Sequence, residues 1–292
     1  MTLYRLVPLI LLWTLAVPPA AAQWTEAPGT GWVQIETLYH STETRFDENG
    51  NLEPLFNADS RSLTTSVFLK GALGVARGVD VWAEVPFHRL QFDDAVRERT
   101  STGVGDPRVF LRVGPGLAGL ADAVPLAVAV RGGVKFSAGD VPVSAEVIPL
   151  TEGQRDWELI VEVGTSLHPW PLYVQGWAGY RWRETNEAIQ RKPGNERFFY
   201  AAAGGSVDRV TWKLGVDGLF GTPPIRNVSP TLDLPLPNDV RELVQILPTV
   251  GYRVGPGAVE VGARIPVHGQ NLPAGPSFTF GYFLSWEKAL WR

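Results

Sequence analysis

From about residue 30 onward, apolar and polar residues alternate with a period of two, the pattern of a β-strand with one apolar face. In residues 154–168, for example, most apolar side chains have odd numbers, as in Leu159 and Val161, and the acidic ones have even numbers. Similar segments recur along the whole chain. The twelve predicted strands span residues 31–41, 61–71, 79–89, 105–114, 125–136, 154–168, 171–183, 196–205, 210–221, 240–254, 257–267 and 277–286.

The faces opposite the apolar ones carry many full charges, and this distinguishes two kinds of β-protein. A soluble double sheet hides its apolar faces and does not usually place so many charges on the opposite ones. An even number of strands of about ten residues is what a bacterial outer-membrane barrel requires. The pattern therefore predicts an all-β fold, a transmembrane antiparallel up-and-down β-barrel of about twelve strands.

Two of the predicted strands have a weak pattern. Residues 196–205 are nearly all small or aromatic, and Pro248 interrupts residues 240–254. Since proline cannot donate a ladder hydrogen bond, it is unusual inside a sheet. The sequence leaves the register of both strands open.

The connectors between the predicted strands alternate in length, with every odd-numbered connector longer than its neighbours. Outer-membrane barrels have short periplasmic turns and long external loops, and an even strand number returns both termini to the periplasm. Aromatic residues fall near the predicted strand ends, where membrane interfaces attract them. Those assigned to the periplasmic and then the outer interface are Trp32, Trp170, Trp212, Tyr252 and Trp286, followed by Tyr39, Trp157, Tyr180, Trp182, Phe198, Tyr200 and Phe278.

The first 22 residues have the features of an export signal. Arg5 precedes an apolar stretch over residues 6–17, and the small residues Ala20 and Ala22 form an A-x-A cleavage site. We expect residues 1–22 to be a cleaved signal peptide and residues 23–292 to be the barrel. No cysteine follows to carry a lipid anchor, and none is present in the 292 residues.

Composition narrows the function. The absence of cysteine excludes disulfide scaffolds, thiolate metal sites and cysteine nucleophiles. The net charge of -4 argues against a nucleic-acid partner, which would select a basic surface. We expect no cofactor and no metal.

If the apolar faces meet lipid, the charged faces line the interior. The predicted lumen carries more basic than acidic groups, and this surplus would favour anions if the charges stay unpaired. Charges of opposite sign stand on neighbouring strands, so ion pairs could instead close the lumen in part. The predicted lumen-lining residues are Glu36, Lys70, Asp80, Glu84, Arg108, Arg112, Arg131, Lys135, Glu158, Glu162, Arg181, Arg183, Lys213, Asp217, Arg253, Glu260 and Arg264.

Three short motifs resemble one family of exported proteins. Residues 102–106 (TGVGD) are similar to its G-x-G-D turn, and residues 134–140 (VKFSAGD) to its V-K-x-P-T-G-D segment, with Ser137 in place of proline. Residues 191–196 (RKPGNE) resemble its R-K-P-G-[DN]-E loop. The family is that of outer-membrane β-barrel transporters of the phenol-degradation meta-pathway type. The resemblance implies a barrel that passes small hydrophobic or aromatic compounds, with Gly103, Gly105, Asp106, Lys135, Gly139 and Asp140 as motif residues.

An enzyme is the least favoured class. His40, His88 and His268 fall at the outer ends of predicted strands that closure would bring near one another, and three unrelated rim residues explain them better than a metal site. The local hydrolase candidate, His88 with Asp93 or Asp94, has no accompanying serine motif. We expect no catalytic residues.

The sequence therefore predicts a pore or transporter for small molecules in the outer membrane of a Gram-negative bacterium. The alternative is a closed barrel that serves as a surface scaffold or adhesin. The expected partners are outer-membrane lipid, lipopolysaccharide bridged to acidic loops by divalent cations, a small-molecule solute and the barrel assembly machinery.

Overall fold

The computed structural model describes residues 25–56, 59–94, 96–119, 126–139, 147–187, 191–226 and 240–290. The signal peptide expected over residues 1–22 lies outside these ranges, and so does Asp140 of the second motif. The division of the chain at residue 23 therefore stays a prediction.

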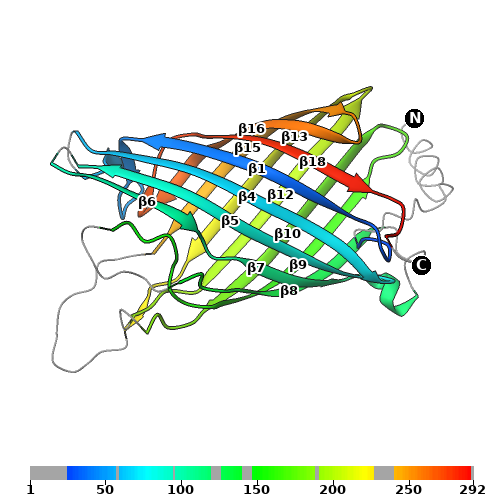
Figure 1. Ribbon diagram of the computed structural model, residues 1–292, viewed down its shortest axis with the longest axis horizontal. Coiled ribbons are helices and arrows are strands. Elements are labelled where there is room, and N and C mark those ends of the chain that lie inside the picture. Colours follow the sequence, from blue (N-terminus) through cyan, green and yellow to red (C-terminus); the bar gives the residue numbers. More distant parts are fainter. Residues whose placement is uncertain are drawn as a thin grey trace, which may run out of the picture.

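A single antiparallel sheet closes on itself and forms a barrel (Figure 1). Strands β6 and β7 both pair with β5, one after the other, and together take the place of one long strand. The barrel therefore has twelve strands. This confirms the predicted fold class. The strands are β1 (Gly31–Thr42), β4 (Arg61–Ala76), β5 (Val79–Asp93), β6 (Glu98–Val104), β7 (Arg108–Val113), β8 (Ala127–Lys135), β9 (Asp156–Ser166), β10 (Leu172–Arg183), β12 (Glu196–Val207), β13 (Val210–Gly221), β15 (Glu242–Val254), β16 (Gly257–Gln270) and β18 (Ser277–Trp286).

The connectors divide the barrel into two unlike ends. At the end that we call the turn end, strands are joined by tight turns at residues 77–78, 208–209 and 255–256. Gly78 and Gly255 have φ values of 72° and 58°, a left-handed conformation that glycine adopts without steric cost. The first residue of β1 pairs with the last of β18, Gly31 with Trp286, at this same end.

Longer connectors meet at the opposite end, which we call the loop end. They include residues 43–60, 136–155, 184–195 and 222–241. Four of their short strands, β2 (Thr44–Phe46), β3 (Leu52–Pro54), β11 (Arg191–Lys192) and β14 (Ile225–Arg226), form small ladders there, the first two with β17 (Leu272–Pro273).

The strict alternation of connector lengths is wrong at one place. The connector between β5 and β6 is only residues 94–97, because these strands keep pairing to Asp93 and Glu98. The next connector, 114–126, is longer although it lies at the turn end, and it contains the 3₁₀ helix η1 (Pro115–Ala118).

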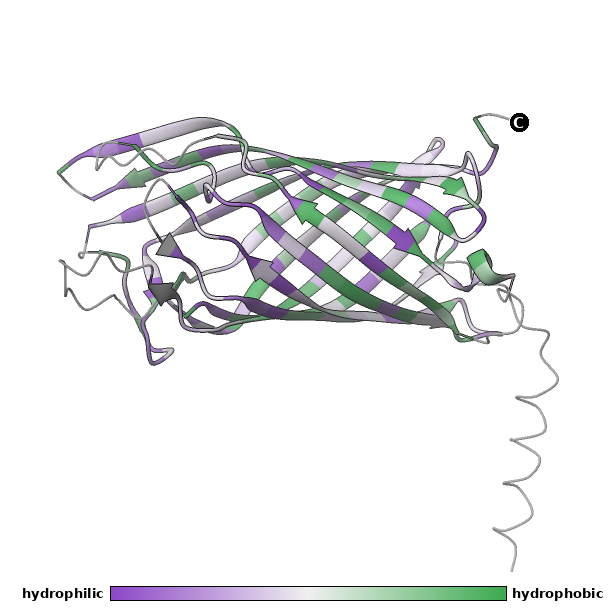
Figure 2. Cartoon of the chain, turned by 90° about the horizontal axis from the view of Figure 1, so that it is seen from below, coloured by the Kyte–Doolittle hydropathy of each residue, from purple (hydrophilic) through white to green (hydrophobic). Residues whose placement is uncertain are grey.

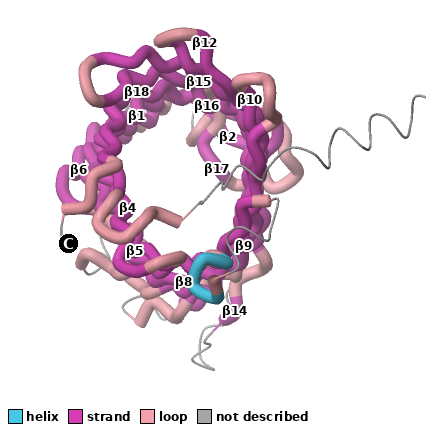
Figure 3. The backbone as a smooth tube through the Cα atoms, turned by 90° about the vertical axis from the view of Figure 1, so that its right-hand side faces the viewer, coloured by secondary structure: helices cyan, strands magenta, loops and turns pink. Residues whose placement is uncertain are grey.

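Burial along the strands is inverted relative to a soluble protein. In β9, Leu159 and Val161 are 46% and 52% exposed, whereas Asp156 and Glu162 are 0% and 3% exposed. The same striping of apolar and polar residues runs along the other strands (Figure 2). Viewed along its axis, the sheet forms a closed ring (Figure 3). An apolar exterior and a charged interior are the arrangement of a transmembrane β-barrel.

No helix in the described ranges has the length and apolar character to cross a membrane.

Some aromatic residues assigned to the membrane interfaces face the interior instead. Trp32 packs on Trp82 and Phe283, with ring centroids 6.0 and 5.7 Å apart. Phe198 is 8% exposed and belongs to an interior apolar cluster with Phe110 and Ile160. The residues of β12 are nearly all aromatic or small, so the sequence does not show which face points inward. The burial of Glu196, at the first position of the strand, identifies that face.

The two strands of open register are now placed. Strand β12 pairs with β10 and β13 along its length. In β15, Pro248 lies opposite Leu214 of β13, and the ladder with β16 shifts register between Val244 and Gln245.

The exposed face of β9 offers a test of membrane insertion. We expect Val161→Arg, at the middle of the strand, to lower the free energy of unfolding by about 2–4 kcal/mol, because a charge at the bilayer midplane is poorly solvated. The measurement is urea unfolding of the barrel folded into lipid vesicles. Val96→Arg is the matched control, since Val96 is 92% exposed in the β5–β6 connector. Equal effects of the two substitutions would contradict a lipid-facing β9.

Candidate functional site: a charged lumen

One group of predicted lumen residues forms an ion-pair cluster toward the turn end, on β5, β7, β8 and β9. Arg112 Nη2 lies 2.8 Å from Asp80 Oδ2, and Arg112 Nη1 lies 3.5 Å from Glu162 Oε2. Arg131 Nε lies 2.9 Å from the other oxygen of Glu162. The Arg131 guanidinium also lies 4.6 Å from the ring centroid of Trp82. The cations thus neutralise two buried carboxylates, and one of them stacks on an aromatic ring.

The chain before β1 contacts this same cluster. The backbone N–H of Glu26 donates to Asp80 Oδ2 at 2.9 Å, and Thr25 is 5% exposed. Gly29 N–H donates to the carbonyl of Gly74 at 2.8 Å. Residues 25–30 therefore lie against the inner wall at the turn end, although the segment is too short to fill the barrel.

A second and larger cluster lies at the loop end. Its centre is Arg183, whose guanidinium contacts Glu152 at 2.8 Å, Glu196 at 3.4 Å and Asp156 at 3.7 Å. Lys135 Nζ lies 2.7 Å from Asp156 Oδ2 and also pairs with Glu152. The cluster thus joins four strands, β8, β9, β10 and β12, to the connector 136–155.

Further cations extend this loop-end cluster around the barrel. Arg241 pairs with Glu196 and, at 3.1 Å, with Glu152. Arg181 Nε lies 2.9 Å from Glu158 Oε1, and its Nη1 contacts Glu196 Oε2. The contact between Arg241 and Glu152 links two connectors, 222–241 and 136–155, at the mouth of the lumen.

A third, smaller group lies on β1, β4 and β16. Glu36 Oε1 accepts from Lys70 Nζ at 3.2 Å and from Arg264 Nη2 at 3.1 Å. Glu260 Oε2 accepts from Gln34 Nε2 at 3.0 Å.

The remaining predicted lumen residues are not brought into these clusters. Within the described ranges, none of them forms an ion pair within 4.0 Å, and Arg253 is exposed at the turn end. They are Glu84, Arg108, Lys213, Asp217 and Arg253.

The G-x-G-D motif occupies the break between β6 and β7. A Cβ atom at Gly105 would lie 2.4 Å from the His88 ring, so only glycine fits there without displacing that ring. Asp106 Oδ1 accepts from Ala138 N–H at 3.2 Å and Oδ2 from Glu152 N–H at 2.9 Å. This carboxylate therefore fastens both limbs of the connector 136–155 to the wall.

The other two motifs reach the same loop-end cluster. Lys135 Nζ lies 3.4 Å from Asp106 Oδ2, which joins the first motif to the second. In the third motif, Asn195 Oδ1 accepts from Arg183 N–H at 3.0 Å. A Cβ at Gly194 would lie 1.6 Å from the carbonyl oxygen of Thr222, so glycine permits the connectors 184–195 and 222–241 to touch. Gly103 lies in β6, and the carbonyl of Gly139 accepts from Thr151 Oγ1 at 3.1 Å.

Several members of the loop-end cluster were missed in the sequence. Asp156 stands at the first position of β9, on the same face as Glu158, so extending the alternation by one step would have found it. Glu196 stands at the first position of β12, where aromatic and small residues leave no alternation to extend. Glu152 and Arg241 lie in connectors, where no period exists to reveal them.

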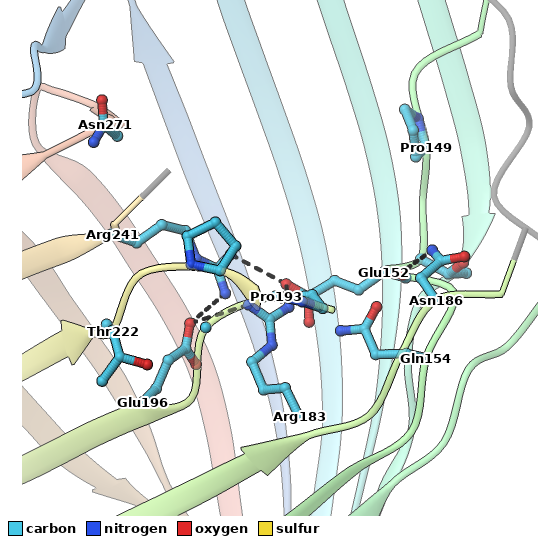
Figure 4. A pocket seen from close by; sticks show the side chains of 14 residues that line it. Pro149, Glu152, Gln154, Arg183, Asn186, Pro193, Glu196, Thr222, Arg241 and Asn271 are labelled. Carbon is cyan, nitrogen blue, oxygen red and sulfur yellow. Dashed lines mark hydrogen bonds and ion pairs between the residues drawn. The ribbon is translucent and has the colours of Figure 1, made fainter. Parts of the chain in front are cut away.

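Two cavities open between inward-facing side chains, one at each end of the barrel. The loop-end cavity has a volume of about 310 Å³ and is lined by Glu152, Arg183, Glu196 and Arg241 (Figure 4). The turn-end cavity has a volume of about 530 Å³, and its lining includes Tyr173. Strands β12, β13 and β15 contribute lining residues, or residues directly adjoining them, to both cavities.

Aromatic side chains occupy the stretch of wall between these cavities. Trp177 stacks on Tyr200 with ring centroids 5.5 Å apart and meets Phe198 edge-on at 5.7 Å. Leu219 and the buried Ile160 pack with Phe198. A solute that moves between the cavities along these strands would meet this apolar level.

The electrostatics of Glu152 reflect its three cationic partners. Burial alone would raise the pKa of its carboxyl group. Arg183, Arg241 and Lys135 outweigh burial and hold that pKa well below its usual range. Glu152 is therefore an anion at any physiological pH.

The histidines do not assemble into one site. His88 Nδ1 lies 2.8 Å from Ser66 Oγ, and His40 Nε2 lies 3.2 Å from the carbonyl of Ala274. His268 Nε2 lies 3.5 Å from Glu242 Oε2. Within the described ranges, no three His, Asp or Glu side chains are arranged to hold a metal ion.

Comparison with known proteins identifies the fold. No protein-family model matches the chain, and no curated protein matches it. An outer membrane channel from Pseudomonas putida F1 is similar in structure, with a TM-score of 0.72 and 12% identity over 92% of this chain and 100% of that chain. This likeness shows the fold of an outer-membrane β-barrel.

Two other solved structures are similar over most of their length with TM-scores below 0.5. The translocator domain of the autotransporter NalP from Neisseria meningitidis has a TM-score of 0.47 and 10% identity, covering 96% of this chain and 97% of that one. The toluene transporter TbuX from Ralstonia pickettii has a TM-score of 0.45 and 10% identity, covering 92% and 94%.

The role of Asp106 as a fastener can be tested by proteolysis. We expect Asp106→Ala to speed cleavage within residues 136–155 by about ten-fold or more, because losing charge-assisted hydrogen bonds costs the connector about 1.5–3 kcal/mol. Limited proteolysis with mass spectrometry locates and times the cut. Glu48→Ala, an exposed carboxylate in another connector, is the control. An unchanged cleavage rate in Asp106→Ala would show that the connector is held by other contacts.

Proposed function

We propose that this protein is an outer-membrane pore that passes small molecules through a narrow, charged lumen. The observation that carries the proposal is the pair of cavities at opposite ends of the barrel, with inward-facing aromatic side chains between them. A barrel built only as a scaffold needs neither cavity.

The membrane setting follows from the exterior. The lipid-facing side of the strands is apolar, and the barrel fold is of the outer-membrane kind. We infer a bacterial outer membrane as the location, with export by the signal peptide at residues 1–22 and insertion by the barrel assembly machinery. Lipid contacts the strands, and lipopolysaccharide contacts the acidic connectors through divalent cations.

The chemistry of the lumen favours solutes with an apolar body. Rings such as Trp177, Phe198 and Tyr200 offer flat surfaces on which another ring stacks. The three motifs resemble the transporter family of the phenol-degradation meta-pathway type, and hydrophobic or aromatic compounds are the solutes which that resemblance implies. The predicted lumen residues act here as the polar walls of the path.

The alternative is a closed barrel that serves as a scaffold or adhesin. The ion pairs of the loop-end cluster favour it, because they join wall and connectors across the mouth. Electrical recording separates the two functions, since a permanently closed barrel inserts without conducting.

Catalysis is not part of the proposal. The Ser66–His88 contact has the residue types of a hydrolase, but Ser66 is only 2% exposed in the barrel wall. A nucleophile must be reachable by its substrate.

The aromatic level between the cavities should limit conduction. We expect Phe198→Ala to raise the single-channel conductance of the refolded mature chain in a planar bilayer, because it removes a ring from the narrow part of the path. Truncating a buried Phe costs about 3–5 kcal/mol, so circular dichroism must first verify folding. Phe278→Ala is the control, since Phe278 is 57% exposed on the outer face. If the unaltered chain and the Phe198→Ala variant both insert without conducting, the result would favour the closed scaffold.

A further inference from the structure

Three cations at the loop end converge on one carboxylate. Glu152 Oε1 accepts from Arg183 Nη2 at 2.8 Å and from Arg241 Nη1 at 3.1 Å, while Oε2 pairs with Lys135 Nζ. Both oxygens of the carboxylate are thus engaged by charged donors from three separate elements, β8, β10 and the connector before β15.

Glu152 differs from the other carboxylates that contact Arg183. The side chains of Glu196 and Asp156 are 1% and 0% exposed and stand on strands, whereas the Glu152 side chain is 35% exposed and stands on a connector. Its backbone is fixed, because its N–H donates to Asp106 and its carbonyl accepts from Asn186 Nδ2 at 2.8 Å. The side chain can therefore turn away while the chain around it stays in place.

The cavity beside this carboxylate has room for a small organic molecule. Its volume of about 310 Å³ lies at the lower end of the range of pockets that bind such ligands, about 300–1,000 Å³. Apolar rings of Pro149, Pro193 and Pro224 line it next to the charged groups. Figure 4 shows Arg183, Arg241 and Glu152 around the cavity, with dashed lines for the ion pairs among the residues drawn.

We propose that Lys135, Arg183 and Arg241 form a binding site for the carboxylate of a small organic acid, and that Glu152 occupies this site as an internal ligand until a solute replaces it. This inference rests on the proposed function, since it names the class of solute that enters the same lumen. The planar guanidinium of arginine matches a carboxylate with two parallel hydrogen bonds, and the proline rings receive the apolar body.

Charge balance permits the exchange. Without Glu152, the loop-end cluster pairs four cations (Lys135, Arg181, Arg183, Arg241) with four carboxylates (Asp106, Asp156, Glu158, Glu196). An incoming carboxylate therefore restores the charge that the cluster already holds with Glu152 bound. The exchange buries no additional charge, so its desolvation cost is small.

The test measures benzoate binding to the refolded mature chain in detergent by isothermal titration calorimetry. An internal competitor weakens apparent affinity by the fraction of time that it leaves the site free. We expect Glu152→Gln, which keeps the shape and removes the charge, to bind benzoate about ten-fold more tightly than the unaltered chain, as a competitor bound about nine-tenths of the time requires. Adding Arg241→Gln to this variant should abolish the gain.

Two controls make the result specific. Glu53→Gln removes a connector carboxylate that is 38% exposed and paired with Arg45 at 2.6 Å, and it should leave benzoate affinity unchanged. Benzyl alcohol, with the same ring and no charge, should gain nothing from Glu152→Gln. Equal benzoate affinity in Glu152→Gln and the unaltered chain would overturn the inference, and so would an equal gain for benzyl alcohol.

The binding and conduction experiments fail separately. Benzoate binding that depends on Glu152, in a chain that is silent in bilayers, would support the site and contradict the pore. A conducting pore whose Glu152→Gln variant binds benzoate no better would overturn the site alone.

Discussion

The constraint on which the rest of the structure depends is that lipid solvates neither an unpaired backbone amide nor a charged side chain. The ladders from β1 to β18 and from β4 to β5 close the sheet, so each described strand of the barrel except β6, which pairs with β5 alone, has a partner on both sides. With the sheet closed, period-two alternation sends one face of each strand to lipid. The charges of the other face then have only the interior available, and the composition of the lumen follows from this geometry.

An interior crowded with charges needs neutralisation within itself. The barrel meets this need by placing charges of opposite sign on several pairs of neighbouring strands, so that Asp80 faces Arg112 in register and Arg181 faces Glu158. Where two basic strands adjoin, Arg112 of β7 and Arg131 of β8 both pair with Glu162 of β9. Two carboxylates with 0% exposure lie close to cations: Asp80 Oδ2 is 2.8 Å from Arg112 Nη2, and Asp156 Oδ2 is 2.7 Å from Lys135 Nζ. Between the ion-pair cluster toward the turn end and the loop-end cluster, apolar rings fill the space and require no charged partner. Polar ends and an apolar middle are thus one solution to packing a narrow barrel.

The sequence was informative wherever a repeating pattern was present. Twelve strands, the closed topology and the antiparallel order could all be predicted, because a period of two in side-chain direction is a property of the backbone itself. The inward face of residues 198–203 could not be predicted, because aromatic and small residues follow one another there and no charged residue marks either face. Connectors have no period, so Glu152 and Arg241 could not be recognised as partners of Arg183, whose own position on β10 was clear.

The short motifs acquire a physical meaning once the connectors are in place. Gly105 and Gly194 stand where a side chain would collide with a neighbouring element, and Asp106 fastens the connector that carries Glu152. Lys135 of the second motif contacts Asp106 of the first, and it also contacts Glu152. Each motif therefore fixes the backbone around the loop-end cluster while leaving one carboxylate partly exposed. Rigid surroundings with a single movable ligand are what an exchangeable binding site needs, since only the side chain has to be reordered when a solute enters.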